Sequence, residues 1–327
     1  MDGIEQIRSH SQRKKNDLTY ILNTMKMNKN IVSGRFIDWR KGRDMQKNPV
    51  RQHTIPKTYL KHFSKDQNTI YLFDKEKDEI REQGIASVSI VKDIYTVVDK
   101  ENEQKLYDLE HLLADDIEPV YNPTLSFIEE NKCILEKRHF AYFIAAQYLR
   151  SPRVKKQILQ EIQNAIINGE SGEIFIERDL RIFNTVFIQE SGQLINFKEF
   201  IKRREEGFSI DTKIDDSCYG QYFVNIISRI SESIASQDWA FIKPPKKRNF
   251  LTSDNPYISA KDYGGSIGWF KGDIFILSKG LALVIGDLEG WYDLNLNDVK
   301  LINNHTVKNS DRYVFSHSKE LLNRFIK

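Results

Sequence analysis

The middle of the chain, residues 103–168, carries apolar residues at helical spacing, and a fold that contains it must bury several helices. Its densest segment, HFAYFIAAQYLRSPR (139–153), is so apolar that we expect most of that helix to be buried. Pro119, Pro123 and Pro152 fall at the ends of the predicted helices, where a missing backbone N–H is tolerated. The sequence therefore predicts three consecutive helical segments.

Both sides of this middle have a different pattern. TIYLFDK (69–75) and IASVSIVKDIYTVVD (85–99) alternate apolar with polar residues and are rich in β-branched residues. Strand signals return in DWAFIKPP (238–245), DIFILSKGLALVIGD (273–287) and RYVFSHS (312–318), after a helix at 219–237. We predict an α+β protein, with a helical middle flanked by two strand-rich ends that can share one mixed or antiparallel sheet. Residues 52–327 are assigned to a single α+β domain, and residues 1–51 to a basic N-terminal helix and connector.

Basic residues are concentrated near the N-terminus. The net charge is +3, but residues 1–51 contain twelve Lys and Arg against five Asp and Glu, which gives that region +7 and the rest −4. Such a region can bind the phosphates of a nucleic acid. Alternatively, its first helix can dock on the acidic body or at a homodimer interface through apolar residues such as Leu18 and Ile21. We expect a docked helix, with the connector 33–47 facing nucleic acid because Phe36 and Trp39 lie there among arginines.

Composition and missing motifs argue against several classes of protein. No run of 18 apolar residues is present and the N-terminal residues lack the apolar core of a secretory signal, so we expect no membrane association. Cys133 and Cys218 have no metal-ligand spacing, which favours a cytoplasmic protein with both thiols buried. P-loop, dinucleotide-binding, GxSxG and HExxH motifs are absent, and zinc is not expected. The glycine-rich YGGSIGWFKGD (263–273) predicts a hairpin or mobile loop.

The first of three polar clusters is QHTIPKTYLKHF, residues 52–63. Pro56 can begin a helix at its first position, which would put His53 just before that helix, close to unpaired N–H groups. Gln52 and His53 would then lie at the edge of a polar pocket that an anion can reach. The alternative is that both side chains only cap the turn.

The second cluster lies at the end of the apolar helix. At helical spacing His139, Gln147 and Arg150 fall close to one stripe. We expect Gln147 and Arg150 to emerge from the core into a cleft, and Arg153 to point toward the same anion or carboxylate. A buried ion pair of Arg150 is the alternative.

The third cluster is the turn in NFLTSDNPYISA (249–260), where Ser253, Asp254 and Asn255 follow a strand. A strand-end Asp beside Ser and Asn can hold a metal, a proton or a substrate hydroxyl, or it can merely cap the turn. A weaker, fourth candidate near the C-terminus consists of Asn304, Asp311 and Arg312.

These clusters in this order resemble the domain-of-unknown-function family 4238. The shared features are the pattern QHxxPxxYLxxF, the helix end RSPR and the turn SDNP, over residues 50–318. The resemblance implies a widespread, mainly microbial protein carried among mobile and defence-associated genes, and it implies no established activity. His53, Pro56, Arg150, Arg153 and Asp254 stand where the pattern expects them, whereas the first fifty residues are extra.

The resemblance favours one assembled pocket over three unrelated caps. In that pocket His53 would act as general acid or base, with Gln52 and Asp254 as further catalytic residues, while Arg150 and Arg153 would bind phosphate. Asp254 would orient His53 or hold a divalent cation such as Mg²⁺ or Mn²⁺, and Gln147, Ser253 and Asn255 would contact substrate. The predicted function is hydrolysis of nucleic acid or nucleotides by a nuclease-type enzyme, as a phage-defence effector or toxin. A non-catalytic module that binds a nucleotide or peptide is the alternative.

Overall fold

The computed structural model describes residues 51–88, 90–92, 97–99, 104–106, 108–168, 187–190, 193–196, 202, 206, 213–214, 218–267 and 270–326. The predictions for the basic helix and connector, residues 1–50, lie outside these described residues. No helix in the described part is both long enough and apolar enough to span a membrane.

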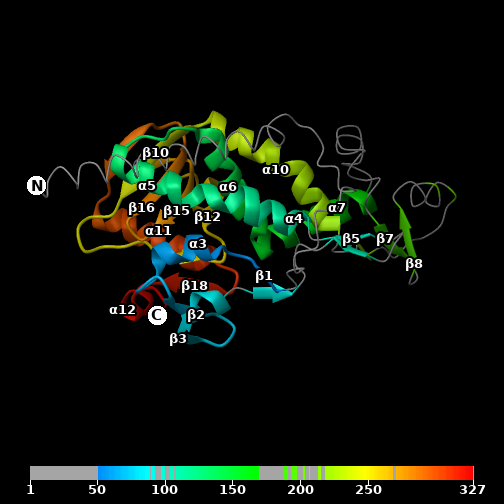
Figure 1. Ribbon diagram of the computed structural model, residues 1–327, viewed down its shortest axis with the longest axis horizontal. Helices are drawn as coiled ribbons and strands as arrows, with labels where there is room; N and C mark the ends of the chain where they lie inside the picture. The colour runs from blue at the N-terminus through cyan, green and yellow to red at the C-terminus, as the bar shows by residue number, and fades with distance from the viewer. Residues whose placement is uncertain are drawn as a thin grey trace, which may run out of the picture.

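The core is built on a five-stranded sheet (Figure 1). Its strands follow the order β12 (Tyr257–Ile258), β15 (Asp273–Ser278), β16 (Leu281–Gly286), β10 (Asp238–Lys243) and β17 (Gly290–Asp293). All pairs are antiparallel except β10 with β17. Almost every residue of β15 and β16 is buried, which explains why their sequence is a continuous apolar run.

A second, four-stranded sheet joins the two strand-rich ends of the chain. Its order is β11 (Thr252–Ser253), β18 (Tyr313–Ser316), β2 (Thr69–Asp74) and β3 (Glu79–Gly84), and every pair is antiparallel. Phe315 lies opposite Leu72 across the β18–β2 pair. The structure therefore confirms the predicted α+β class and the sheet shared between the two strand-rich ends.

Smaller sheets complete the strand inventory of the described residues. β1 (Arg51–His53) pairs with β4 (Ile90–Lys92), β5 (Val97–Asp99) with β6 (Gln104–Leu106), and β13 (Ser266–Ile267) with β14 (Phe270–Lys271). β7 (Phe187–Glu190) lies between β8 (Gln193–Asn196) and β9 (Lys213–Ile214). The β13–β14 pair is the hairpin that the glycine-rich segment predicts.

The helical middle is confirmed. It contains α4 (Asp108–His111), the π-helical turn η3 (Leu112–Ile117), the 3₁₀ turn η4 (Glu118–Val120), α5 (Tyr121–Asn131), α6 (Lys137–Arg150) and α7 (Pro152–Asn168). α6 packs beside α10 (Cys218–Ser236), as Figure 1 shows. It also faces the five-stranded sheet, where Phe143 lies edge-on to Phe275 with ring centroids 6.3 Å apart. This burial holds the end of α6, and thus Arg150, in a fixed position.

Short elements connect and cover the sheets. α3 (Lys57–Leu60) continues into the 3₁₀ turn η1 (Lys61–Phe63), and two further 3₁₀ turns are η2 (Ile85–Ser87) and η5 (Ala260–Tyr263). α11 (Leu296–Asn309) and α12 (Lys319–Asn323) lie near the C-terminus, and α12 contacts β18 and β2.

Two predictions about local structure are wrong, and one helix was missed. Residues 104–106 form strand β6 rather than the start of a helix, because they pair with β5. α11 was not expected, although Asn295 caps it by accepting the N–H groups of Asn297 and Asp298. Cys133 is exposed rather than buried, since it follows the left-handed Lys132 that ends α5.

Candidate functional site

His53 is the last residue of β1 and is half-buried. Its Nδ1 lies 3.1 Å from the carbonyl oxygen of Val88, so the neutral ring carries its proton on Nδ1 and its lone pair on Nε2. Burial, followed by the positive charge of Lys57, lowers the pKa of His53, while the Val88 hydrogen bond and Glu118 act in the opposite direction. His53 is therefore a neutral base at pH 7. Gln52 beside it is fully buried.

Arg150, at the end of α6, forms the buried ion pair that was the alternative to phosphate binding. Its Nη2 donates to Oε1 of Glu118 at 2.7 Å, and only 1% of its side chain is exposed. Burial raises the pKa of Glu110, and the charges of Arg150 and Glu118 also act on this carboxyl. Since His53 is influenced by the same two charges, we call His53, Glu110, Glu118 and Arg150 the Arg150 cluster.

Two uncharged polar side chains near Arg150 are buried without hydrogen bonds to other described residues. Gln147, one helical turn earlier, is 1% exposed, and neither Oε1 nor Nε2 has a partner there. The Oγ of Ser151 is also buried and has no hydrogen-bond partner among the described residues. A buried polar group without a partner costs about 1–3 kcal/mol, so a native protein keeps one where it has a use. Gln147 is thus enclosed, whereas the sequence predicted that it emerges from the core into a cleft.

Asp254 follows β11 and is almost completely buried. Its Oδ1 accepts the backbone N–H of Asp311 at 2.8 Å, and its Oδ2 accepts those of Arg312 and Tyr313 at 2.7 and 2.8 Å. Burial raises the pKa of Asp254 to about 6 and outweighs these three donors. Both oxygens thus hold the start of β18, and the His53 ring is oriented by Val88 rather than by Asp254.

The neighbours of Asp254 are also engaged within the turn. Ser253 Oγ donates to the carbonyl of Asn255 at 2.8 Å and accepts its N–H at 3.1 Å. Asn255 Nδ2 donates to the carbonyl of Asn309 at 3.3 Å. Both residues are buried, and substrate contact by them stays a prediction.

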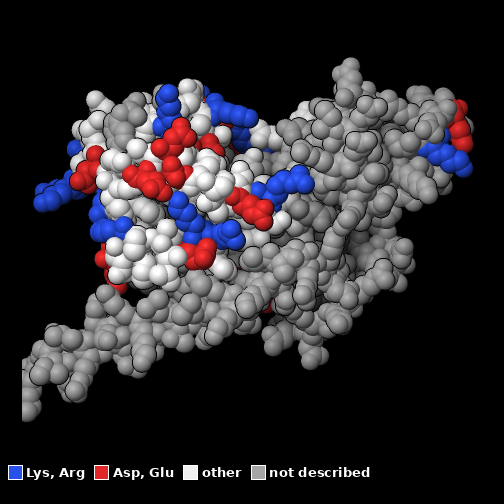
Figure 2. Space-filling model, turned by 90° about the horizontal axis from the view of Figure 1, so that it is seen from above, with Lys and Arg blue, Asp and Glu red and all other residues white. Residues whose placement is uncertain are grey.

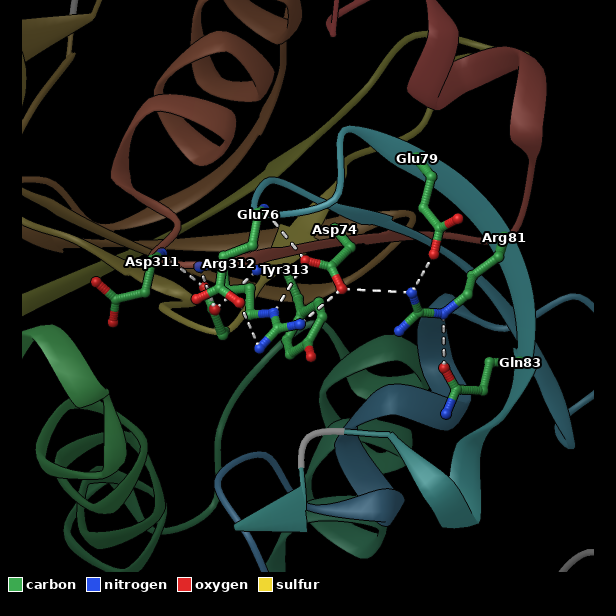
Figure 3. Close-up of polar contacts among 9 residues, drawn as sticks. Asp74, Glu76, Glu79, Arg81, Gln83, Asp311, Arg312 and Tyr313 are labelled. Carbon is green, nitrogen blue, oxygen red and sulfur yellow. Dashed lines mark hydrogen bonds and ion pairs between the residues drawn. The ribbon is translucent and has the colours of Figure 1, made fainter.

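A second carboxylate, Asp74 at the end of β2, is surrounded by arginines (Figure 3). Arg312 Nε and Nη2 donate to its two oxygens at 2.9 and 3.0 Å, and Arg81 Nη1 approaches Oδ2 at 3.3 Å. The hydrogen bonds and charge of Arg312 lower the pKa of Asp74 despite its burial. Asp74 was missed by the sequence analysis, although TIYLFDK places an acid directly after buried apolar residues.

Arg153 joins the predicted clusters through its backbone as well as its side chain. Its N–H donates to Asp311 Oδ2 at 2.6 Å, and its guanidinium lies 3.7 Å from a carboxylate oxygen of Asp262. The backbone N–H of Asp311 in turn donates to Asp254, so the RSPR and SDNP motifs are linked through the C-terminal candidate. Asn304, also predicted there, lies instead at a different cavity.

A cavity of about 390 Å³ lies between these segments, and we call it the central cavity. Thr54 next to His53, Pro152 between Arg150 and Arg153, and Asp254 all contribute to its wall. Val88, whose carbonyl holds His53, lines it too. Segments from all the predicted clusters therefore meet at one cavity, which the charged residues Glu76, Arg81, Asp311 and Arg312 complete.

Tyr59, the tyrosine of the first motif, has a structural role. Its hydroxyl donates to the carbonyl of Ile276 and shares a hydrogen bond with Thr252 Oγ1, each at 2.7 Å. Burial raises the pKa of Tyr59 well above its usual range, so the hydroxyl stays protonated. This tyrosine thus anchors the strand that leads into the SDNP turn.

Within the described residues, no group of three or more His, Cys, Asp and Glu is placed to hold a metal ion.

Comparison with known proteins agrees with this layout of motifs. The family model described as protein of unknown function (DUF4238) matches residues 51–320, which span the central cavity and the Arg150 cluster. No curated protein and no solved structure matches the chain. The match begins at β1 and ends within α12, so it leaves out the basic region 1–50. The chain therefore belongs to the DUF4238 family.

Proposed function

We propose that this protein is a hydrolase of nuclease type, acting on nucleic acid or nucleotides, with His53 as the general base. In this scheme the substrate phosphate approaches through the central cavity, and the His53 Nε2 takes a proton from water as the water oxygen attacks phosphorus. The P–O bond to the leaving group breaks, the leaving oxygen takes a proton from solvent, and His53 returns its proton to solvent. Arg150 stabilises the negative charge that develops on the phosphate, in exchange for part of its bond to Glu118.

The observation that carries the proposal is the hydrogen bond, the lowered pKa and the charged surroundings of His53. A carbonyl holds its Nδ1, its pKa is lowered, and the charges of Lys57, Glu118 and Arg150 act on it. Shifted pKa values on several groups gathered at one place are typical of active sites. A neutral imidazole with a defined lone pair is suited to general-base catalysis near pH 7.

The experiment is an assay of purified full-length protein with total RNA, plasmid DNA and nucleotides, with and without Mg²⁺ or Mn²⁺. His53→Ala is expected to lower the rate by about 10²–10⁴-fold, the usual contribution of a general base. His62→Ala is the matched control, because His62 lies nine residues away and its Nε2 contacts Asn122 at 2.9 Å. Equal rates for wild type and His53→Ala, with both proteins folded, would contradict the proposal.

The pH profile separates the enzyme from a non-catalytic binding module. Because the pKa of His53 is lowered from its usual value near 6.5, kcat/KM should rise with pH through a limb below about 6.5 and be flat at pH 7. The alternative, a module that binds a nucleotide or peptide end, gives no turnover with any of these substrates.

Capture of nucleic acid is proposed for the basic N-terminal region. On the face seen in Figure 2, Lys and Arg side chains of the described body lie interspersed with Asp and Glu, which disfavours phosphate capture there. Residues 1–51 carry +7. Deleting residues 1–50 should reduce the log–log salt dependence of binding by about 0.7–0.9 for each phosphate that this region binds. A lower Tm or a changed oligomeric state with unchanged binding would indicate a docked helix or homodimer interface instead.

The cellular setting follows from the same proposal. Two cysteines without metal-ligand spacing fit a reducing cytoplasm, where a nuclease can reach nucleic acid. As a phage-defence effector or toxin, the wild-type protein should slow the growth of bacteria that express it. His53→Ala should relieve that toxicity at equal protein level, and persistent toxicity would exclude His53 as its cause.

A further inference from the structure

A second cavity, of about 510 Å³, lies between α11, α12 and the turn at residues 247–249, and we call it the α11–α12 cavity. Leu321 and Phe325 line it and pack on the cluster that contains Phe73 and Val314. Leu72 and Tyr313, the strand neighbours of those two residues, line the central cavity. Since consecutive strand residues point to opposite faces, the two cavities lie on opposite faces of the four-stranded sheet.

The lining of the α11–α12 cavity is strongly basic. Lys247, Arg248, Lys300 and Arg324 are exposed there, and none of them forms an ion pair with another residue that the structure describes. The acidic residue of the lining, Glu320, accepts a hydrogen bond from Ser318 Oγ at 2.6 Å. Unpaired cations around a hollow focus a positive potential into it, which favours an anionic ligand.

One wall of the cavity is apolar. Val299 and Leu321 lie beside Leu296, which is 39% exposed, and beside the half-buried ring of Phe325. Burial lowers the pKa of His317, which also lines the cavity, so at pH 7 this ring offers hydrogen bonding rather than charge. An apolar wall with an aromatic ring suits a planar group that stacks, whereas the cations suit phosphates.

We propose that the α11–α12 cavity binds a nucleoside phosphate, with its phosphates on the four cations and its base against Phe325 and Leu321. The volume lies within the range of small-molecule sites, about 300–1,000 Å³, which favours a mononucleotide over a nucleic-acid strand. This site is separate from His53 and does not depend on the proposed hydrolysis.

The test is calorimetric titration of the full-length protein with ATP. Lys300→Glu and Arg324→Glu should each weaken binding by about tenfold or more, since each reverses a charge next to the phosphates. Lys308→Glu is the matched control: it makes the same change at an exposed position of α11 that does not line the cavity. Equal effects of Lys300→Glu and Lys308→Glu, or no ATP binding by the wild type, would overturn the proposal.

The two halves of the ligand are tested separately. Adenosine and tripolyphosphate should each bind more weakly than ATP, and Phe325→Ala should weaken ATP binding but leave tripolyphosphate binding unchanged. Adenosine binding as tightly as ATP would refute the role of the cations, and tripolyphosphate binding as tightly would refute the stacking wall. Thermal melting shows that each variant is folded.

His53→Ala separates this site from the proposed catalytic centre. It should bind ATP with wild-type affinity, whatever happens to its hydrolytic activity. A loss of ATP binding in His53→Ala would place the ATP site elsewhere and overturn the proposal. A Lys300→Glu variant that loses RNA binding but keeps ATP binding would do the same.

Discussion

The Arg150 cluster and the carboxylates next to β18 both lie in or next to segments that line the central cavity, yet their polar groups are used differently. Around β18, Asp254 accepts three backbone N–H groups and Asp74 accepts two arginines. Near the Arg150 cluster, Gln147 is buried without a hydrogen bond to any described residue. The two carboxylates have hydrogen-bond partners among the described residues, whereas the Gln147 side chain has none there.

This difference separates residues that hold the fold from residues that are free to act on a ligand. Each hydrogen bond to a charged group contributes about 1.5–3 kcal/mol, and an unsatisfied buried amide costs about as much. We therefore expect substitutions around β18 to change stability and substitutions near Arg150 to change activity. Three substitutions test this expectation.

Asp74→Ala should have the largest effect. It leaves Arg312 and Arg81 without their shared carboxylate, and both arginine side chains are only about one-third exposed, at 34% and 31%. The free energy of unfolding in urea should fall by about 3–4 kcal/mol. Glu82→Ala on the neighbouring strand is the control, because its contact with Lys65 is 3.9 Å long and exposed. Equal decreases in the free energy of unfolding for the two variants would show that Asp74 contributes no more to stability than an exposed ion pair.

Asp254→Asn should change the pH dependence of stability. The carboxyl titrates near about 3.9 in the unfolded chain and at about 6 when folded, so the folded protein binds this proton more tightly. Its contribution is present below about pH 4 and is lost as the pH rises through about 6. Wild type should therefore lose about 2–3 kcal/mol relative to Asp254→Asn between about pH 4 and pH 7. Parallel stability curves for the two proteins would show that Asp254 does not titrate in this way.

Gln147→Leu should have the smallest effect on stability. A side chain of similar size that needs no hydrogen bonds should leave unfolding unchanged or raise its free energy by up to about 1 kcal/mol. The proposed hydrolysis should nevertheless slow, because Gln147 is a predicted substrate contact. Asn303→Leu is the control, since Asn303 is equally buried but bonds the N–H of Leu251 and the carbonyl of Asn249 at 2.9 and 3.1 Å. If Gln147→Leu destabilises as much as Asn303→Leu, Gln147 has a structural partner.

Much of the fold was predictable because its signals are local. The apolar spacing of residues 139–150 predicts α6, and the β-branched run 273–286 predicts the β15–β16 hairpin. The sequence analysis did not predict α11, because most of its residues are polar and its apolar face has only a few buried residues, among them Val299 and Ile302. Strand β6 escaped because three residues take their conformation from a partner strand, not from their own spacing.

The motifs predicted which residues gather around the central cavity but not what each one does there. Asp254 and Arg150 were expected to act on a ligand, and both are occupied, by backbone amides and by Glu118 respectively. Their partners come from residues 57 positions and 32 positions away. Glu118 carries no motif, and although Asp311 was a candidate, nothing in the sequence paired its backbone with Asp254.

The sequence by itself determined the α+β class, the helical middle, the sheet that joins the two ends, and membership of the family. These properties depend on periodicity and on local residue order, which are visible along the chain. Only the tertiary structure decided that His53 is held by Val88 and that Gln147 is enclosed. It alone brought four cations from three segments around the α11–α12 cavity. Burial, pKa and hydrogen-bond satisfaction depend on neighbours distant in sequence, and packing alone selects those neighbours.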